Sequence, residues 1–159
     1  MSSIQQAPSP VRHIERCTCT SRVRTFGCAM AAETSSVPLL RRLACRVVRE
    51  WHLPESVEEA VGLIVTELTS NAVRHSGSSD VVLRIAAFGG RLVLHVKDFG
   101  HWRVPAPSAP AEEACSGRGL DLVGAFAAHS EIVATTEGTR VVAEILLPPP
   151  MEPRCRIGA

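Results

Sequence analysis

The stretch PESVEEAVGLIVTELTSNAVRHSG, residues 54–77, decides the fold of this chain. Its apolar residues recur at the spacing of one buried helical stripe: Val57, Val61, Ile64 and Leu68. Pro54 suits the start of a helix, and Ser76–Gly77 is typical of a helix end. The stretch therefore predicts a long helix with one buried face.

Two hairpins are predicted on the C-terminal side of this helix: residues 81–88 with 91–98, and residues 131–136 with 139–147. Gly89–Gly90 and Glu137–Gly138 supply their turns, because glycine tolerates the backbone conformations that tight turns need. Between the hairpins, the proline-rich segment 99–116 predicts a long loop, and residues 119–128 predict a short helix. Loops of this length within a compact domain are often functional, so we expect the segment to act as a lid.

A strand and another helix are predicted on the N-terminal side. The strand covers residues 23–29, and the helix begins at Ser35 or Ser36 with Pro38 in its first turn. The residues that this helix is expected to bury are Leu39, Leu43, Val47 and Trp51. Strands grouped apart from helices indicate an α+β fold, a two-layer α/β sandwich with helices packed on one face of a mixed, mainly antiparallel sheet.

The chain is expected to hold one domain, residues 22–148, between two tails. Residues 1–21 show neither helical nor strand periodicity and are predicted to form a mobile tail. The proline-rich residues 149–159 are predicted to form a second tail. The 159 residues are enough for one hydrophobic core, and 45% hydrophobic with 21% charged residues is the balance of a globular protein.

Composition and charge exclude several classes of protein. The net charge is +1 and basic residues are interspersed with acidic ones, which argues against direct binding of nucleic acid. No apolar run approaches the roughly 20 residues that span a bilayer, and the first residues lack the apolar segment of a secretory signal. A cytoplasmic location is therefore expected. The six cysteines lack the paired spacing of zinc ligands and are interpreted as ordinary thiols.

Three short patterns place polar residues where they favour ligand binding. Glu67 and Asn71 lie about one helical turn apart, at the border of the predicted buried stripe. Asp98 continues the inward-facing series of its strand, where a carboxylate is costly unless something pairs with it, and Gly100 follows. Residues 116–120, SGRGL, open the short predicted helix, whose first N–H groups favour an anion. Each pattern alone is common, but their combination is specific.

Together these segments resemble the nucleotide-binding boxes of the GHKL ATPase superfamily. The matching stretches are ELTSNAVRH (67–75), DFG (98–100), SGRGLDLV (116–123) and EGTRVVAEI (137–145). The pattern looks most similar to the small anti-sigma-factor kinases, histidine-kinase-like ATP-binding proteins common in actinobacteria, and covers roughly residues 24–147. Gyrase-like relatives usually carry a further glycine after D-x-G, where this chain has His101 and Trp102.

The resemblance implies ATP and Mg²⁺ as ligands and gives a role to each matched residue. It implies that Asn71 is the metal ligand and that Glu67 is the general base. Asp98 would accept a hydrogen bond from the adenine amino group, with Gly100 beside the ring. The further nucleotide contacts that it implies are His75, Gly117, Arg118, Gly119, Leu120 and Thr139.

The resemblance also implies a protein serine/threonine kinase of the anti-sigma-factor type. Such a kinase transfers the γ-phosphoryl group of ATP to a small antagonist protein of the anti-anti-sigma type, and a sigma factor or similar protein is its second partner. The resemblance allows a homodimer and implies no direct contact with nucleic acid or membrane. A nucleotide-gated module that binds a partner without significant kinase activity is the alternative.

Overall fold

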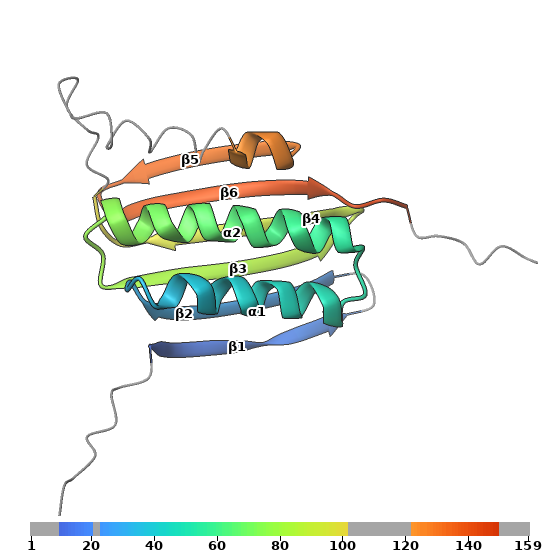
Figure 1. Ribbon diagram of the computed structural model, residues 1–159, viewed down its shortest axis with the longest axis horizontal. Coiled ribbons are helices and arrows are strands. Elements are labelled where there is room, and N and C mark those ends of the chain that lie inside the picture. The colour runs from blue at the N-terminus through green and yellow to red at the C-terminus, as the bar shows by residue number, and fades with distance from the viewer. Residues whose placement is uncertain (1–9, 21–22, 102–121, 150–159) are drawn as a thin grey trace, which may run out of the picture.

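The computed structural model describes residues 10–20, 23–101 and 122–149, which form two layers (Figure 1). Two long helices cover one face of a six-stranded sheet. The elements in chain order are β1 (Val11–Thr20), β2 (Val23–Ala31), α1 (Ser36–Glu50), α2 (Glu55–His75), β3 (Asp80–Phe88), β4 (Arg91–Asp98), β5 (His129–Thr135) and β6 (Gly138–Leu146). A short helix at 122–126 precedes β5.

The strands follow the order β1-β2-β3-β4-β6-β5, and every ladder between described strands is antiparallel. The predicted α+β sandwich with helices on one face is confirmed, although these ladders contain none of the parallel pairing that a mixed sheet implies. Both predicted hairpins are present. Gly89 and Gly90 turn β3 into β4 with φ of 56° and 74°, and Gly138 closes the turn between β5 and β6.

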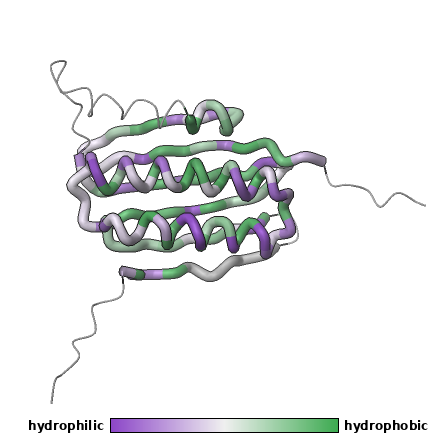
Figure 2. The backbone as a smooth tube through the Cα atoms, in the orientation of Figure 1, coloured by the Kyte–Doolittle hydropathy of each residue, from purple (hydrophilic) through white to green (hydrophobic). Residues whose placement is uncertain are grey.

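The helix α2 buries the predicted stripe against the sheet. The exposed fractions of its apolar residues are 5% for Val57, 0% for Val61, 0% for Ile64 and 1% for Leu68. They share one core with alternate residues of the central strands, such as Leu83 of β3 and Leu94 of β4. Figure 2 shows hydrophobic residues concentrated along these strands, whereas both helices alternate between hydrophobic and hydrophilic residues. This alternation keeps one side of each helix in water.

The buried face of α1 differs in part from the predicted one. Its buried apolar residues are Leu40, Ala44, Val48 and the predicted Val47, and the predicted Trp51 is buried directly after the helix. Leu39 and Leu43 are half-buried at the edge of the core. The reason is that α1 packs against α2 as well as the sheet, which turns its buried face toward α2. The two helices approach closely at Gly62, where an added Cβ would lie 3.2 Å from the Cys45 sulfur.

The prediction that residues 1–21 form a tail without regular structure is wrong for residues 11–20. These residues form β1, which pairs with β2 at the edge of the sheet. The ladder shifts register between Val11 and His13 and again between Glu15 and Thr18. Such irregularities break the alternation that identifies a strand in a sequence. Residues 1–9 and 150–159 of the predicted tails lie outside the described residues.

The segment between β4 and β5 is described only at its two ends. The predicted short helix at 119–128 corresponds to a helix at 122–126, which buries Val123. Most of the predicted lid, together with residues 117–120, falls within 102–121 and lies outside the described residues. Among the helices that the structure describes, none combines the length and apolar character needed to cross a bilayer.

Cys28 of β2 and Cys45 of α1 are free thiols with raised pKa values. Burial raises the pKa of the Cys28 thiol to about 11. Burial is also the main reason that the pKa of Cys45 is raised, and the charge of Glu58 adds to it. Both thiols are therefore protonated near neutral pH, and neither has the thiolate character that reactive cysteines need.

The buried stripe of α2 leads to a first prediction. Ile64→Ala is expected to lower the free energy of unfolding by about 2–5 kcal/mol, because it removes apolar contacts and leaves a cavity at a fully buried position. Ile132→Ala is the matched control, since Ile132 is 45% exposed and its loss should cost less than about 1 kcal/mol. Urea denaturation measures both. Equal losses would contradict the core described here.

Candidate functional site

A buried carboxylate lies at the end of β4. Asp98 is only 2% exposed, and its Oδ1 accepts hydrogen bonds from the backbone N–H groups of Gly100 at 3.1 Å and Thr139 at 3.2 Å. A carboxylate removed from water is costly unless such donors satisfy it. Asp98 therefore joins the segment after β4 to the first residues of β6.

Three consecutive backbone N–H groups after β4 all have hydrogen-bond acceptors nearby. The N–H of Phe99 donates to the Ser78 Oγ at 3.0 Å, and the N–H of His101 donates to the Ser76 carbonyl at 2.9 Å. The N–H of Gly100, between them, donates to Asp98. The end of α2 and the end of β4 are thus held together, although more than twenty residues separate Ser76 from His101 in the sequence.

Two glycines allow this close approach. A Cβ added to Gly100 would lie 1.9 Å from the Ser76 carbonyl oxygen, and one added to Gly138 would lie 2.1 Å from the Asp98 carbonyl oxygen. Gly138 also has a φ of 121°, a conformation that other residues rarely adopt. Only glycine fits at either position. The end of α2 and the β5–β6 turn therefore contact the backbone around Asp98 directly.

The predicted α2 residues lie along one face of the helix, next to this end of the sheet. Asn71 is 6% exposed, whereas Glu67 and His75 are half-buried. Spacings of four residues place the three side chains in a row that runs toward the end of the helix. The row contains a carboxylate, an amide and an imidazole, all of which can bind a ligand or a metal ion.

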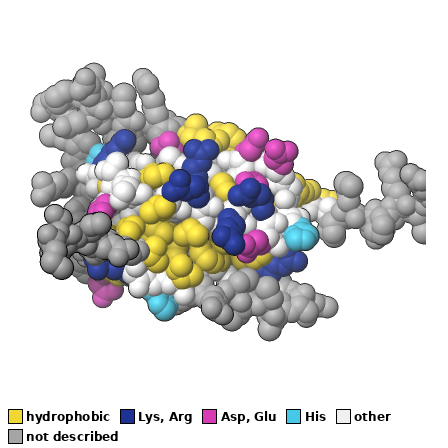
Figure 3. All heavy atoms as spheres, turned by 60° about the horizontal axis from the view of Figure 1, so that its bottom comes forward, with side chains coloured by type: hydrophobic (Ala, Val, Ile, Leu, Met, Phe, Trp, Pro, Cys, Tyr) yellow, Lys and Arg dark blue, Asp and Glu magenta, His cyan; other side chains and the backbone are white. Residues whose placement is uncertain are grey.

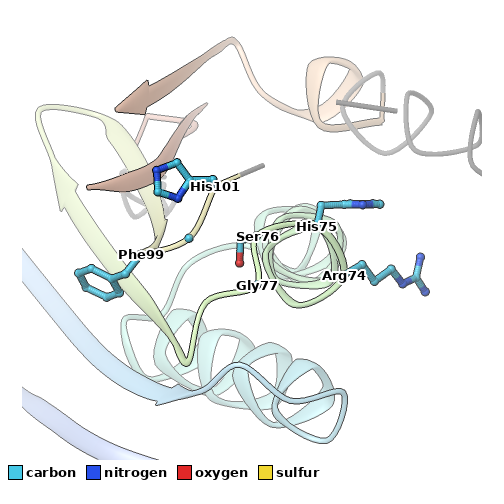
Figure 4. A pocket seen from close by; sticks show the side chains of 7 residues that line it. Arg74, His75, Ser76, Gly77, Phe99 and His101 are labelled. Atoms are coloured by element: carbon cyan, nitrogen blue, oxygen red, sulfur yellow. The ribbon is translucent and has the colours of Figure 1, made fainter. Parts of the chain in front are cut away.

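A cleft of about 550 Å³ opens where the end of α2 faces the segment after β4 (Figure 4). Residues 74–77 line one side of it and residues 99–101 line the other. Its volume is within the range of small-molecule sites. Of the predicted site residues, His75 and Gly100 line the cleft, and Asp98 is hydrogen-bonded to Gly100.

The structure brings together part of the predicted site. Asp98, Gly100 and Thr139 meet at one end of the sandwich, where His75 also lies. Asn71 lies one turn before His75 on α2, and Glu67 lies two turns before it. The predicted phosphate contacts Gly117, Arg118, Gly119 and Leu120 lie outside the described residues, as does Trp102.

Sequence reasoning missed Ser76, Ser78 and Gly138 as parts of the site. Ser76 was interpreted only as part of a helix end and Gly138 only as part of a turn, and Ser78 matched no motif. In the structure the Ser78 Oγ accepts the N–H groups of Phe99 and Asp80 and donates to the Asp80 carbonyl at 2.7 Å. Serine clusters next to glycine often bond to local backbone, and the run S-G-S-S at 76–79 was a usable signal.

The class of protein follows from a comparison with known families. The family model described as the histidine kinase-like ATPase domain matches residues 30–145. The chain belongs to this family, and an ATPase domain is a domain that binds ATP. No curated protein matches the chain.

A solved structure has the same fold. It contains the RsbU and RsbW domains of Rv1364c from Mycobacterium tuberculosis, with a TM-score of 0.64 and 18% sequence identity. The similarity covers 79% of this chain but 33% of that chain. This chain therefore spans about a third of the length of its structural relative, and the similarity concerns the fold.

The contact between Gly100 and α2 leads to a second prediction. Gly100→Ala is expected to lower the free energy of unfolding by about 1–3 kcal/mol, because the backbone of Ser76 and Ser78 must move to admit the methyl group. Gly124→Ala is the control, since nothing lies within 4 Å of its added Cβ. Thermal unfolding compares the two variants. A Gly100→Ala protein as stable as the control would contradict the contact.

Proposed function

We propose that this chain is an ATP-dependent protein serine/threonine kinase of the anti-sigma-factor type. Its substrate would be a serine or threonine on a small antagonist protein of the anti-anti-sigma type. A sigma factor or similar protein would be its second partner, and the cytoplasm its location. The observation that carries the proposal is the buried Asp98 carboxylate of an ATPase fold, which accepts the N–H of Gly100, a residue that lines the cleft.

Asp98 has the chemistry that recognition of adenine requires. An ionised carboxylate only accepts hydrogen bonds, and the exocyclic amino group of adenine is a donor. Backbone N–H groups on Oδ1 fix the orientation of the carboxyl group. Gly100 lines the cleft next to Asp98, and the buried Thr139 donates its N–H to the same carboxylate. These residues fit a bound adenine, and we assign adenine recognition to Asp98, Gly100 and Thr139.

The residues of α2 and the segment before the short helix would hold the phosphates. Asn71 offers an amide oxygen of the kind that Mg²⁺ accepts when phosphates and water complete its coordination. His75, which lines the cleft, is assigned a contact to the nucleotide. Gly117, Arg118, Gly119 and Leu120 stay predicted phosphate contacts. When bound, Mg-ATP supplies the phosphoryl group for transfer.

Glu67 is proposed as the general base. It is half-buried and lies one helical turn before Asn71, so a hydroxyl group held near the phosphates would come within reach of its carboxylate. A base at this position takes the proton from the attacking serine or threonine of the partner. General bases contribute typically 10²–10⁴-fold to the rate, mainly in the transition state.

The role of Asp98 can be tested with one substitution. Asp98→Asn keeps one acceptor oxygen for the N–H groups of Gly100 and Thr139, but it places a donor where the adenine amino group would donate. ATP affinity is expected to fall by about 1–3 kcal/mol. Asp80→Asn, at the start of β3, is the control. Calorimetry measures binding, and unchanged affinity in Asp98→Asn would exclude the adenine contact.

A pair of α2 variants separates a kinase from a binding module. Glu67→Gln is expected to bind ATP and partner nearly normally but to phosphorylate the partner at least about a hundredfold more slowly, because only the base is lost. Asn71→Ala is expected to weaken Mg-ATP binding itself, since a metal ligand is removed. Transfer of labelled phosphate and ATP calorimetry are the measurements. Equal transfer rates in Glu67→Gln and wild type would exclude Glu67 as the base. A wild type that binds ATP and captures a partner without transfer would support the module.

A further inference from the structure

The sheet has a second face, which neither long helix covers. Both α1 and α2 lie on the same side of the sheet (Figure 1). Burial alternates along β3, β4 and β6, so every second residue of these strands points to the opposite side. We call the part of that side formed by Arg84, His95, Lys97 and Arg140 the basic sheet face.

Basic residues are direct neighbours across the strands of this face. Lys97 of β4 is opposite Arg140 of β6, and Arg84 of β3 is opposite His95 of β4. Like charges directly opposite each other in an antiparallel pair destabilise a sheet. Burial lowers the pKa of the His95 imidazole, and the charges of the three basic residues around it lower it further. His95 is therefore mainly neutral near pH 7, and the positive charge of this face is carried by Arg84, Lys97 and Arg140.

The acidic residues on this side of the sheet are engaged elsewhere or lie at its margin. Glu144 of β6 pairs with Arg91 at 3.0 Å, and Asp80 lies 3.5 Å from Arg12. Glu131 lies on the edge strand β5, opposite Val142. Among the described residues, no ion pair joins an acid to Lys97 or Arg140. Arg84 has a further interaction of its own, so the argument rests on Lys97 and Arg140.

The charges on the helical layer are arranged differently. Positive and negative side chains lie side by side there (Figure 3), with the ion pair Arg46–Glu50 at 2.8 Å within α1 and the ion pair Arg49–Glu58 at 3.3 Å between α1 and α2. Interspersed charges of this kind are an ordinary solvated surface. The basic sheet face instead holds Lys97 opposite Arg140 on neighbouring strands, and a bound partner of opposite charge would reduce the repulsion between them.

Apolar groups accompany these charges. Val93 and Val142 are half-buried on the same side of the sheet, and Phe99 is 50% exposed with the Lys97 ammonium 4.9 Å from the centre of its ring. A surface that combines cations with apolar side chains suits an acidic peptide with hydrophobic residues better than a nucleic-acid backbone, which offers mainly phosphate charge.

We propose that the basic sheet face binds an acidic, partly hydrophobic segment of a partner protein, with Lys97 and Arg140 as its main charged contacts. The face also adjoins the nucleotide cleft. Phe99 lines that cleft, and Arg140 directly follows Thr139, whose N–H donates to Asp98. A segment bound here would lie next to the nucleotide site without occupying it. The proposal stands independently of kinase activity.

The test uses a fluorescein-labelled peptide of alternating glutamate and leucine as the probe, with fluorescence anisotropy as the readout. The variant carries Lys97→Gln and Arg140→Gln. The control carries Arg42→Gln and Arg46→Gln on the exposed side of α1, which removes the same charge from the other layer. We expect the sheet-face variant to bind the peptide about tenfold more weakly and the control to bind like the wild type. Affinity should fall between about 0.01 M and 0.15 M ionic strength.

Thermal unfolding of the same proteins supplies a second readout. The sheet-face variant should unfold at the same temperature as the wild type or higher, because an unfavourable pair is removed. A lower unfolding temperature would show that Lys97 and Arg140 serve the fold and would overturn the proposal. So would equal losses of peptide affinity in variant and control, or no loss in the variant. Tighter binding of a single-stranded oligodeoxynucleotide of equal charge would also overturn it.

Discussion

The Asp98 carboxylate is buried at the end of β4, and the arrangement of the candidate site depends on how it is satisfied. One of its oxygens accepts N–H groups from Gly100 and from Thr139, 41 positions further along the chain. The price of burying a charge is thereby offset by bonds that connect separate parts of the fold. These bonds extend the β4–β6 ladder, which ends at Lys97 and Arg140, to the residues that follow β4.

The same end of the sandwich also fixes the position of α2. The Ser76 carbonyl and the Ser78 hydroxyl accept N–H groups of the segment after β4, so the end of the helix is tied to Asp98. Because an α-helix is rigid, this contact also sets where Asn71 and Glu67 lie relative to the end of β4. A nucleotide site that spans a strand end and a helix face needs such a connection, since the two belong to different layers.

The two faces of the sheet have different physical characters. The face under the helices belongs to the hydrophobic core. Neither long helix covers the opposite face (Figure 1), where Lys97 is directly opposite Arg140, an unfavourable pairing of like charges. We propose different surfaces for the nucleotide and the protein partner, and Phe99 belongs to both, since it lines the cleft and contacts Lys97.

Local patterns in the sequence determined α2, both hairpins and the inward direction of Asp98, because helix and strand periods are properties of short segments. The family could be recognised from the order and spacing of its motifs. Tertiary structure alone decided the face that α1 buries, the pairing of β1 and the convergence of Ser76, Ser78 and Gly138 on the backbone around Asp98. These features depend on contacts between residues far apart in the chain, and such contacts leave no periodic signal in the segments that make them.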